Sequence, residues 1–456
     1  MEEPRDSPIC NSIDRISNLP ENLIHHILSF MDMTQVVHTC VLSKRWKNLW
    51  AITSILNLFS LAISNKNQNS AVPFQKFIKF VDQIFILRDN SNIQSVNLVC
   101  GKQRNFVIDI SIMTASLTTW IVAAVRSNIQ ELYLDIAAVK ISRFPQCLFT
   151  CTSLIKLELK LGGNSSIIVL PSSMDLLRLT FMNLDSLPSD VNLTNRLFSK
   201  CPVLESLIIK GRLGHMDLQI SSLTLKHLTM VDFVSKSKVK VDAPNLVYFK
   251  CRDFISKLYF LENLVSLVTA DIYMSATKDE AGKIEDYTKN HWLFLTALSN
   301  AKEIRLSEWF LCLWARGFFA ASCKNSLQFS NLRLVKLKSY LPKYLIRALG
   351  WLLCISPNVE SLSIVNLGMS SKDIPDSEDF FAGVPLDHLR FVEIRGLLGH
   401  FNELKLVEII FKKAVVLEKM LLFSCKKSTT GKCLTTFGEK LLTLPRASSN
   451  ITTFLI

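Results

Sequence analysis

The sequence predicts an α/β protein in which a small N-terminal helical cluster precedes a solenoid of repeated short strands with helices or loops between them. At 456 residues the chain is too long for one ordinary domain, unless it is a repeat array. Apolar residues recur at helical spacing in segment 19–50. From residue 93 onward, a six-residue pattern with apolar residues at positions one, four and six returns some thirteen times.

The first sixty residues predict three short helices. Pro20 can occupy the first turn of a helix, where its missing N–H costs nothing. A second helix is expected after Asp32, and a third over Lys44–Trp50, with Ser43 as its N-cap. Three helices in about 35 residues cannot bury all of this apolar surface among themselves. The sequence therefore predicts that a neighbouring domain or a partner protein covers the rest.

The segment Asp14–Trp50 resembles an F-box, in the form common in plant proteins. The matching features are the Leu-Pro pair at 19–20 and the segments Ile27–Phe30, Leu42–Trp46 and Leu49–Trp50. The resemblance implies docking on a Skp-type adaptor and, through it, on a cullin–RING ubiquitin ligase. The alternative is an ordinary three-helix cap on the next domain. The residues expected to contact the adaptor are Leu19, Pro20, Ile24, Ile27 and Leu28.

The repeated pattern predicts a stack of short parallel strands. One strand cannot bury its apolar side alone, but many strands in register form a continuous sheet with helices or loops on the outside. The pattern resembles the irregular leucine-rich repeats of plant F-box proteins, which implies a parallel sheet on a concave face. Clear copies include Ile129–Leu134, Leu154–Leu159 and Leu204–Ile209, and others are placed at Leu176–Phe181 and Leu264–Thr269.

The C-terminal segment predicts a strand, a glycine-containing turn, a helix and another strand. The block Asn402–Leu422 resembles the FBD region found at the C-terminus of many plant F-box proteins, and its place in the chain predicts that it caps the stack. A final helix is expected over 437–449 and an edge strand over 451–456. The predicted divisions are a disordered tail at 1–13, an F-box at 14–60, a solenoid at 61–380 and an FBD-like region at 381–456.

The composition indicates a non-catalytic protein of a reducing compartment. The twelve cysteines form no CxxC pair, and the N-terminus does not resemble a signal peptide. No apolar run is long enough to span a bilayer. Nucleophile elbows, phosphate-binding glycine loops, HExxH and dinucleotide fingerprints are all missing from the sequence. We therefore expect no cofactor, no metal, no membrane partner and no enzymatic activity, and a location in the nucleus, the cytoplasm or both.

The predicted concave surface carries an excess of basic residues. Positions two, four and six after each pattern start give 39 residues, of which eleven are basic and five acidic, a balance of +6. This predicts an acidic or phosphorylated ligand. Ordinary solvated charge is the alternative. The candidate cargo-facing residues are Lys156, Lys160, Arg178, Lys210, Lys250, Arg252, Lys336 and Lys338.

Taken together, these features predict the substrate-recognition subunit of an SCF-type (Skp–cullin–F-box) ubiquitin ligase, in which the repeats bind the target protein. One alternative is a leucine-rich-repeat binding module whose F-box is non-functional and serves as a cap. Nucleic acid is a less favoured partner: the net charge of +13 suggests it, but the sequence has no recognisable nucleic-acid module.

Overall fold

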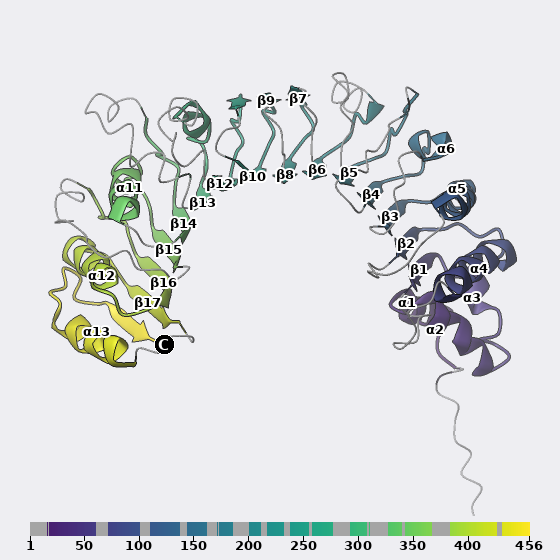
Figure 1. Cartoon of the computed structure of the whole chain (residues 1–456), viewed down its shortest axis with the longest axis horizontal. Coiled ribbons are helices and arrows are strands. Elements are labelled where there is room, and N and C mark those ends of the chain that lie inside the picture. Colours follow the sequence, from purple (N-terminus) through teal and green to yellow (C-terminus); the bar gives the residue numbers. More distant parts are fainter. Residues whose placement is uncertain are drawn as a thin grey trace, which may run out of the picture. The chain divides into compact units, whose positions relative to one another are not determined.

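The chain forms two compact units, residues 1–185 and 186–456, each built on a parallel sheet (Figure 1). The predicted tail at 1–13 lies outside the residues that the structure describes. No helix among the described residues is long and apolar enough to cross a membrane. This computed structural model describes residues 16, 18–60, 72–100, 110–136, 144–161, 171, 173–185, 200–210, 217–231, 238–254, 258–276, 292–307, 310, 327–339, 343–366, 384–425 and 431–456.

The N-terminal cluster contains the three predicted helices, but the third is shorter than expected. They are α1 (Glu21–Ser29), α2 (Met33–His38) and α3 (Leu49–Ile52), with the 3-10 turn η1 (Thr39–Val41) after α2. Residues 44–48 form turns instead of helix, and the Ser43 hydroxyl, which was expected to cap them, has no hydrogen-bond partner among the described residues. Asp32 does cap α2, since its Oδ1 accepts the Thr34 N–H at 2.8 Å.

The sheet of the first unit contains five parallel strands in chain order. Helices cover one of its faces; the other, here called the open face, has no helix over the last four strands among the described residues, while at the first strand the N-terminal cluster packs against it (Figure 1). The first strand was not predicted, although its apolar residues follow the repeat pattern. The strands are β1 (Ile55–Phe59), β2 (Ser95–Val99), β3 (Glu131–Ile136), β4 (Lys156–Leu161) and β5 (Phe181–Asp185); the helices are α4 (Val72–Leu87), α5 (Ile110–Arg126) and α6 (Gln146–Phe149).

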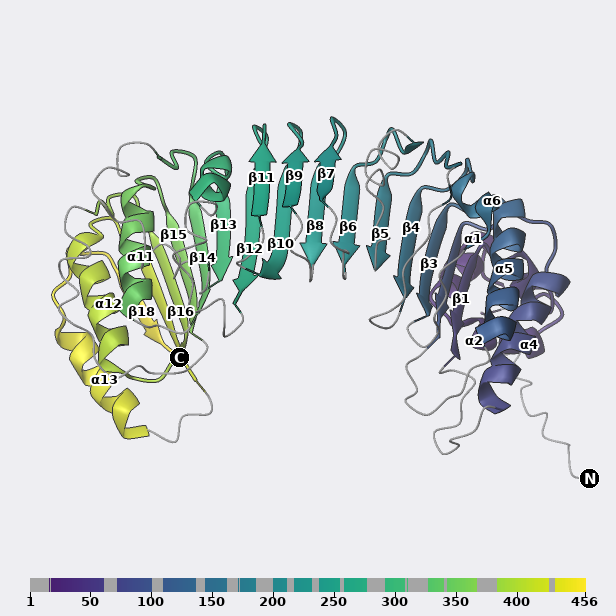
Figure 2. The same cartoon turned by 45° about the horizontal axis from the view of Figure 1, so that its top comes forward.

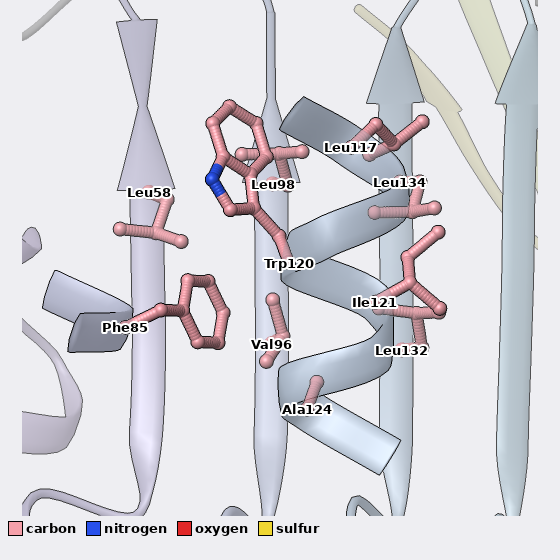
Figure 3. A pocket seen from close by; sticks show the side chains of 10 residues that line it. All are labelled: Leu58, Phe85, Val96, Leu98, Leu117, Trp120, Ile121, Ala124, Leu132 and Leu134. Atoms are coloured by element: carbon pink, nitrogen blue, oxygen red, sulfur yellow. The ribbon is translucent and has the colours of Figure 1, made fainter. Parts of the chain in front are cut away.

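A small apolar cavity lies between this sheet and its helices (Figure 3). Its volume of about 10 Å³ is close to that of a single water probe, and its apolar lining offers a water no partners. It is therefore a packing gap and not a ligand site. The lining residues are Leu58, Val96, Leu98, Leu132 and Leu134 from the strands, Phe85 from α4, and Leu117, Trp120, Ile121 and Ala124 from α5.

The second unit continues the same construction with a longer parallel sheet, whose face opposite the outer elements is likewise called its open face (Figure 2). In its first repeats the outer segments are strands instead of helices and form a separate three-stranded sheet. The main strands are β6 (Ser206–Lys210), β8 (His227–Val231), β10 (Tyr248–Phe254), β12 (Thr269–Ser275), β13 (Glu303–Ser307), β14 (Leu334–Ser339), β15 (Ser361–Asn366), β16 (Phe391–Leu397), β17 (Lys419–Ser424) and β18 (Thr452–Leu455). The outer elements are β7 (Leu218–Ser221), β9 (Lys238–Asp242), β11 (Leu258–Glu262), α11 (Lys343–Cys354), α12 (Phe401–Lys413) and α13 (Gly431–Thr443).

These strands confirm the predicted fold class, an α/β solenoid behind a helical cluster, but two copies of the pattern were placed three residues too early. In β5 the residue opposite Leu157 is Met182, so that this copy starts at Leu179. In β12 the residue opposite Phe249 is Ala270, so that its copy starts at Leu267. In both places an additional buried leucine precedes the true start by three residues, and the apolar pattern therefore fits two frames.

The C-terminal elements largely follow the prediction. Strands β16 and β17 flank α12, and β18 forms the expected edge strand beside β17. Helix α13 begins at Gly431 and ends at Thr443, earlier than the predicted 437–449. Pro445 explains the early end, because proline disfavours a helical conformation in the residue before it and cannot donate a helical hydrogen bond.

The turn before α12 depends on one buried carboxylate. Glu403 is 2% exposed and accepts backbone N–H groups from Leu398, Gly399 and His400 at 3.0, 2.8 and 2.9 Å. Burial raises the pKa of Glu403 although these hydrogen bonds act to lower it. Gly399 adopts a φ of 82°, which a residue with a side chain rarely does. The carboxylate thus holds the chain as it enters the helix.

We predict that Gly438→Ala stabilises the C-terminal end of the second unit. Gly438 lies inside α13, where alanine is favoured over glycine by about 0.5–1 kcal/mol. A Cβ atom there would meet Leu455 Cδ2 at 3.5 Å, an ordinary van der Waals contact. Chemical denaturation followed by circular dichroism should show a gain of that size. A loss of stability would contradict the described packing of α13 against β18.

Candidate functional site

Helix α1 carries two apolar stripes that have opposite environments. Ile24 and Leu28 are both 0% exposed and lie in the core. Leu23, Ile27 and the C-cap residue Phe30 lie on another side of the helix, where they are 46%, 43% and 76% exposed. Residues three or four positions apart share a helix face, so the second group forms one surface, here called the outer face of α1.

Other apolar side chains near α1 are also exposed. Ile16 precedes the helix and is 54% exposed, while Val41 and Leu42 follow α2 and are 83% and 54% exposed. Single exposed apolar residues are normal on a soluble protein, but six large ones within 27 residues indicate a surface that another molecule covers.

The buried side of the cluster packs against the protein's own sheet. Asn57 of β1 is 8% exposed, and its Nδ2 donates hydrogen bonds to the carbonyls of Ser29 and Met31 at 2.9 and 3.1 Å. The second carboxylate oxygen of Asp32 accepts the Phe59 N–H at 3.3 Å. Strand β1 therefore occupies the inner side of the helices, and the outer face of α1 stays exposed in the described structure.

Two of the five residues expected to contact an adaptor are buried in the described structure. Ile24 and Leu28 are buried because their stripe forms the core, so they belong to the fold and not to an accessible surface. Pro20 and Ile27 are exposed and Leu19 is half-buried, as a contact role requires. Four exposed residues that suit the same role were not predicted from the sequence: Leu23, Phe30, Val41 and Leu42. The sequence did contain a signal for them, because its apolar residues form two stripes on different sides of α1.

Comparisons with known proteins agree with this architecture. An F-box domain model matches residues 16–58, and an FBD model matches residues 385–422. A model described as the LRR repeats of FBD-associated F-box protein At5g56370 matches residues 117–257. A putative FBD-associated F-box protein of Arabidopsis thaliana is 30% identical to this chain, with 95% of this chain and 98% of that protein covered.

The chain belongs to the FBD-associated F-box/LRR-repeat family. Two further Arabidopsis relatives are 28% identical. One is a putative F-box/LRR-repeat protein, with 95% of this chain and 97% of the relative covered, and the other is an FBD-associated F-box protein, with both chains covered completely. F-box/LRR-repeat proteins are in general non-catalytic adaptors of SCF-type ligases. Their F-box interacts with Skp-type adaptors, and the proteins also bind targets.

The basic residues proposed to face cargo are divided between the two units of this F-box/LRR-repeat protein. Lys156 and Lys160 lie on the open face of β4 in the first unit. Arg178 lies in the turn before β5 and not on the strand, since its copy of the repeat starts three residues later than predicted. The other five lie on open-face strands of the second unit: Lys210, Lys250, Arg252, Lys336 and Lys338.

The open face of the first unit is not basic, although the sequence predicted a concave surface with a net positive charge. Its described strands carry two cations and four carboxylates, and several of these groups interact. Lys156 pairs with Glu131 at 2.8 Å, and Lys160 donates to the Tyr133 hydroxyl at 2.8 Å. Any anion site of this protein is therefore expected in the second unit. The cations are Lys156 and Lys160, and the carboxylates are Glu131, Asp135, Glu158 and Asp185.

Proposed function

We propose that this protein is the substrate-recognition subunit of an SCF-type ubiquitin ligase. In this proposal the outer face of α1 docks on a Skp-type adaptor, and the leucine-rich repeats hold a target protein near the ubiquitin-transferring enzyme. The protein raises the local concentration of the target and carries out no bond chemistry itself. A place in the nucleus or the cytoplasm, where such ligases would meet their targets, is part of the same proposal.

The observation that carries the proposal is that one apolar stripe of α1 is buried and the other is exposed. Ile24 and Leu28 supply the core of the cluster, so Leu23, Ile27 and Phe30 are not needed for folding and yet are apolar. An apolar helix face of this kind suits docking against another protein, where burial of each large side chain contributes roughly 1.5–3 kcal/mol. The F-box match over residues 16–58 supports a Skp-type adaptor as that protein.

Co-expression tests the proposal directly. The full chain, carrying an affinity tag, is produced together with an untagged plant Skp-type adaptor, and the purified material is sized by light scattering. We expect a stable complex with one copy of each protein. If the full chain folds but elutes without the adaptor, the proposal fails, and the alternative of a repeat protein whose F-box is only a cap is favoured.

A further inference from the structure

Five basic residues gather on the open face of four neighbouring strands in the second unit. Strands β10, β12, β13 and β14 pair in parallel and in register, so their alternating open-face side chains form rows across the sheet. Two carboxylates, Asp271 and Glu303, share this region. We call the five basic residues the cationic patch: Lys250, Arg252, Arg305, Lys336 and Lys338.

The two carboxylates do not neutralise the patch. Glu303 accepts from Arg305 Nε at 2.9 Å and from Lys336 Nζ at 2.9 Å, so one acid serves two bases. Asp271 pairs with Lys250 at 3.5 Å. Burial alone would raise the pKa of Glu303, but the hydrogen bonds from Lys336 and Arg305 outweigh it and the pKa is lowered. Five cations against two carboxylates leave a formal net charge of +3.

The row of open-face residues that runs from Arg252 on β10 to Lys338 on β14 contains two of the five cations. Arg252 stacks over the ring of its neighbour Tyr273, with 5.0 Å from the guanidinium carbon to the ring centre. Lys338 is exposed and has no carboxylate partner among the described residues. Three strand spacings separate β10 from β14, about 14 Å. No acid from the described part of the open face lies in this row.

A small residue lies between the two ends of the row. Ser307 faces Lys338 across the strand pair, and its hydroxyl bonds to the backbone of Met274, accepting the N–H at 2.9 Å and donating to the carbonyl at 2.8 Å. This short side chain is only 3% exposed, so longer side chains around it cover it. Lys338 lies on one side of it, and Arg252 lies beyond Tyr273 on the other.

We infer that the cationic patch binds a phosphorylated serine or threonine in a segment of the target protein. A phosphoryl group carries up to two negative charges and three strong acceptor oxygens, so it can accept from several cations at once and offset most of the excess of three. Arginine also binds phosphate through two parallel hydrogen bonds. A carboxylate ligand would supply only one negative charge, and the region of the patch already contains two carboxylates of its own. This inference rests on the proposed function and names the chemistry of its target.

Peptide binding by the full chain tests the inference. Three fluorescein-labelled peptide pools share random flanking residues and differ at one fixed position, which is phosphoserine, serine or glutamate. Fluorescence anisotropy should show at least tenfold tighter binding of the phosphoserine pool than of the other two. Equal binding of the glutamate and phosphoserine pools would overturn phosphate recognition, and equal binding of all three would overturn the site.

Two lysine substitutions then locate the site. Lys338→Glu should weaken binding of the phosphoserine pool at least tenfold, because it reverses an exposed charge of the patch. Lys240→Glu is the matched control: Lys240 lies on outer strand β9 in an exposed pair with Glu262 at 2.9 Å, so its replacement alters net charge equally without touching the patch. The control should change binding less than twofold. Equal losses from both variants would show a non-specific charge effect and overturn the site.

Adaptor capture by the same proteins separates this inference from the proposed function. Lys338→Glu should still form the complex with the Skp-type adaptor, because the patch lies in the second unit and the outer face of α1 in the first. If the wild-type chain binds the phosphoserine pool but no adaptor, the proposed function fails and the phosphate site stands. If it binds the adaptor but binds the phosphoserine pool no better than the serine pool, the phosphate site fails and the proposed function stands.

Discussion

An Ile27→Asp substitution should reduce capture of a Skp-type adaptor by more than a hundredfold while the protein stays folded. Ile27 lies in the middle of the outer face of α1 between Leu23 and Phe30 and is 43% exposed. Loss of its burial in a complex costs about 1.5–3 kcal/mol, and a carboxylate in a dry interface adds a desolvation penalty. Because each 1.4 kcal/mol is a factor of ten, the combined loss exceeds two orders of magnitude. Surface plasmon resonance with immobilised adaptor measures it.

The matched control for this variant is Ile86→Asp. Ile86 is an isoleucine at the end of α4 in the same unit, 75% exposed, and the same substitution there adds the same charge. We expect adaptor capture by Ile86→Asp to equal that of the wild type. Both variants should unfold at the wild-type temperature, since neither replaced side chain lies in the core. Undiminished capture by Ile27→Asp would remove the outer face of α1 from the interface.

The repeat strands were predicted well because the apolar positions of the pattern are buried in every correctly framed copy. Leu154, Leu157 and Leu159 of one copy are all 0% exposed, and the corresponding positions of the other correctly framed copies are buried in the same way. The pattern failed where an additional buried leucine, such as Leu264, offered a second frame. Nothing in a single sequence distinguishes the two frames. Only the hydrogen-bonded register with the neighbouring strand does so.

That error of frame also affected the predicted binding surface. With the copy placed at Leu264, Asp271 fell on an unexamined position, although it faces Lys250 on the open side of the sheet. Charges on neighbouring strands lie about twenty to thirty residues apart in the sequence. Whether two charges pair depends on the register of their strands, so a sum over pattern positions does not show how many cations already have an ionic partner. In the first unit the frame error at β5 counted Arg178 and left out Asp185, which concealed the acidic balance of that sheet.

Helix α1 shows a different limit of prediction from sequence. Helical periodicity identifies which residues share a face, but both stripes of α1 are apolar, and periodicity alone cannot say which one the protein buries. The choice depends on β1, which was not predicted as a strand. The polar residue of β1 that holds the helix in place, Asn57, gives no signal of its role in the sequence.

An Asn57→Leu substitution should accelerate hydrogen exchange of the α1 amides about a hundredfold. Leucine has a similar volume but leaves the Ser29 and Met31 carbonyls without the donor that Asn57 supplies. It also removes the acceptor of Asn97, which donates to Asn57 Oδ1 at 2.7 Å. Three lost hydrogen bonds at about 1 kcal/mol each lower the free energy of local opening by about 3 kcal/mol. Native-state hydrogen exchange with mass spectrometry measures this.

Asn97→Leu separates the role of Asn57 from the general cost of removing an amide on this face. It deletes only the bond to Asn57 and leaves both bonds to the helix carbonyls, so exchange of the α1 amides should rise only about fivefold, the equivalent of about 1 kcal/mol. Equal acceleration by the two variants would mean that the Asn57 contacts do not hold α1. Since neither change touches Leu23, Ile27 or Phe30, both variants should still capture the adaptor. If α1 is held less firmly and the adaptor still binds, the two stripes of α1 have different functions. One stripe then serves the fold and the other binds the partner.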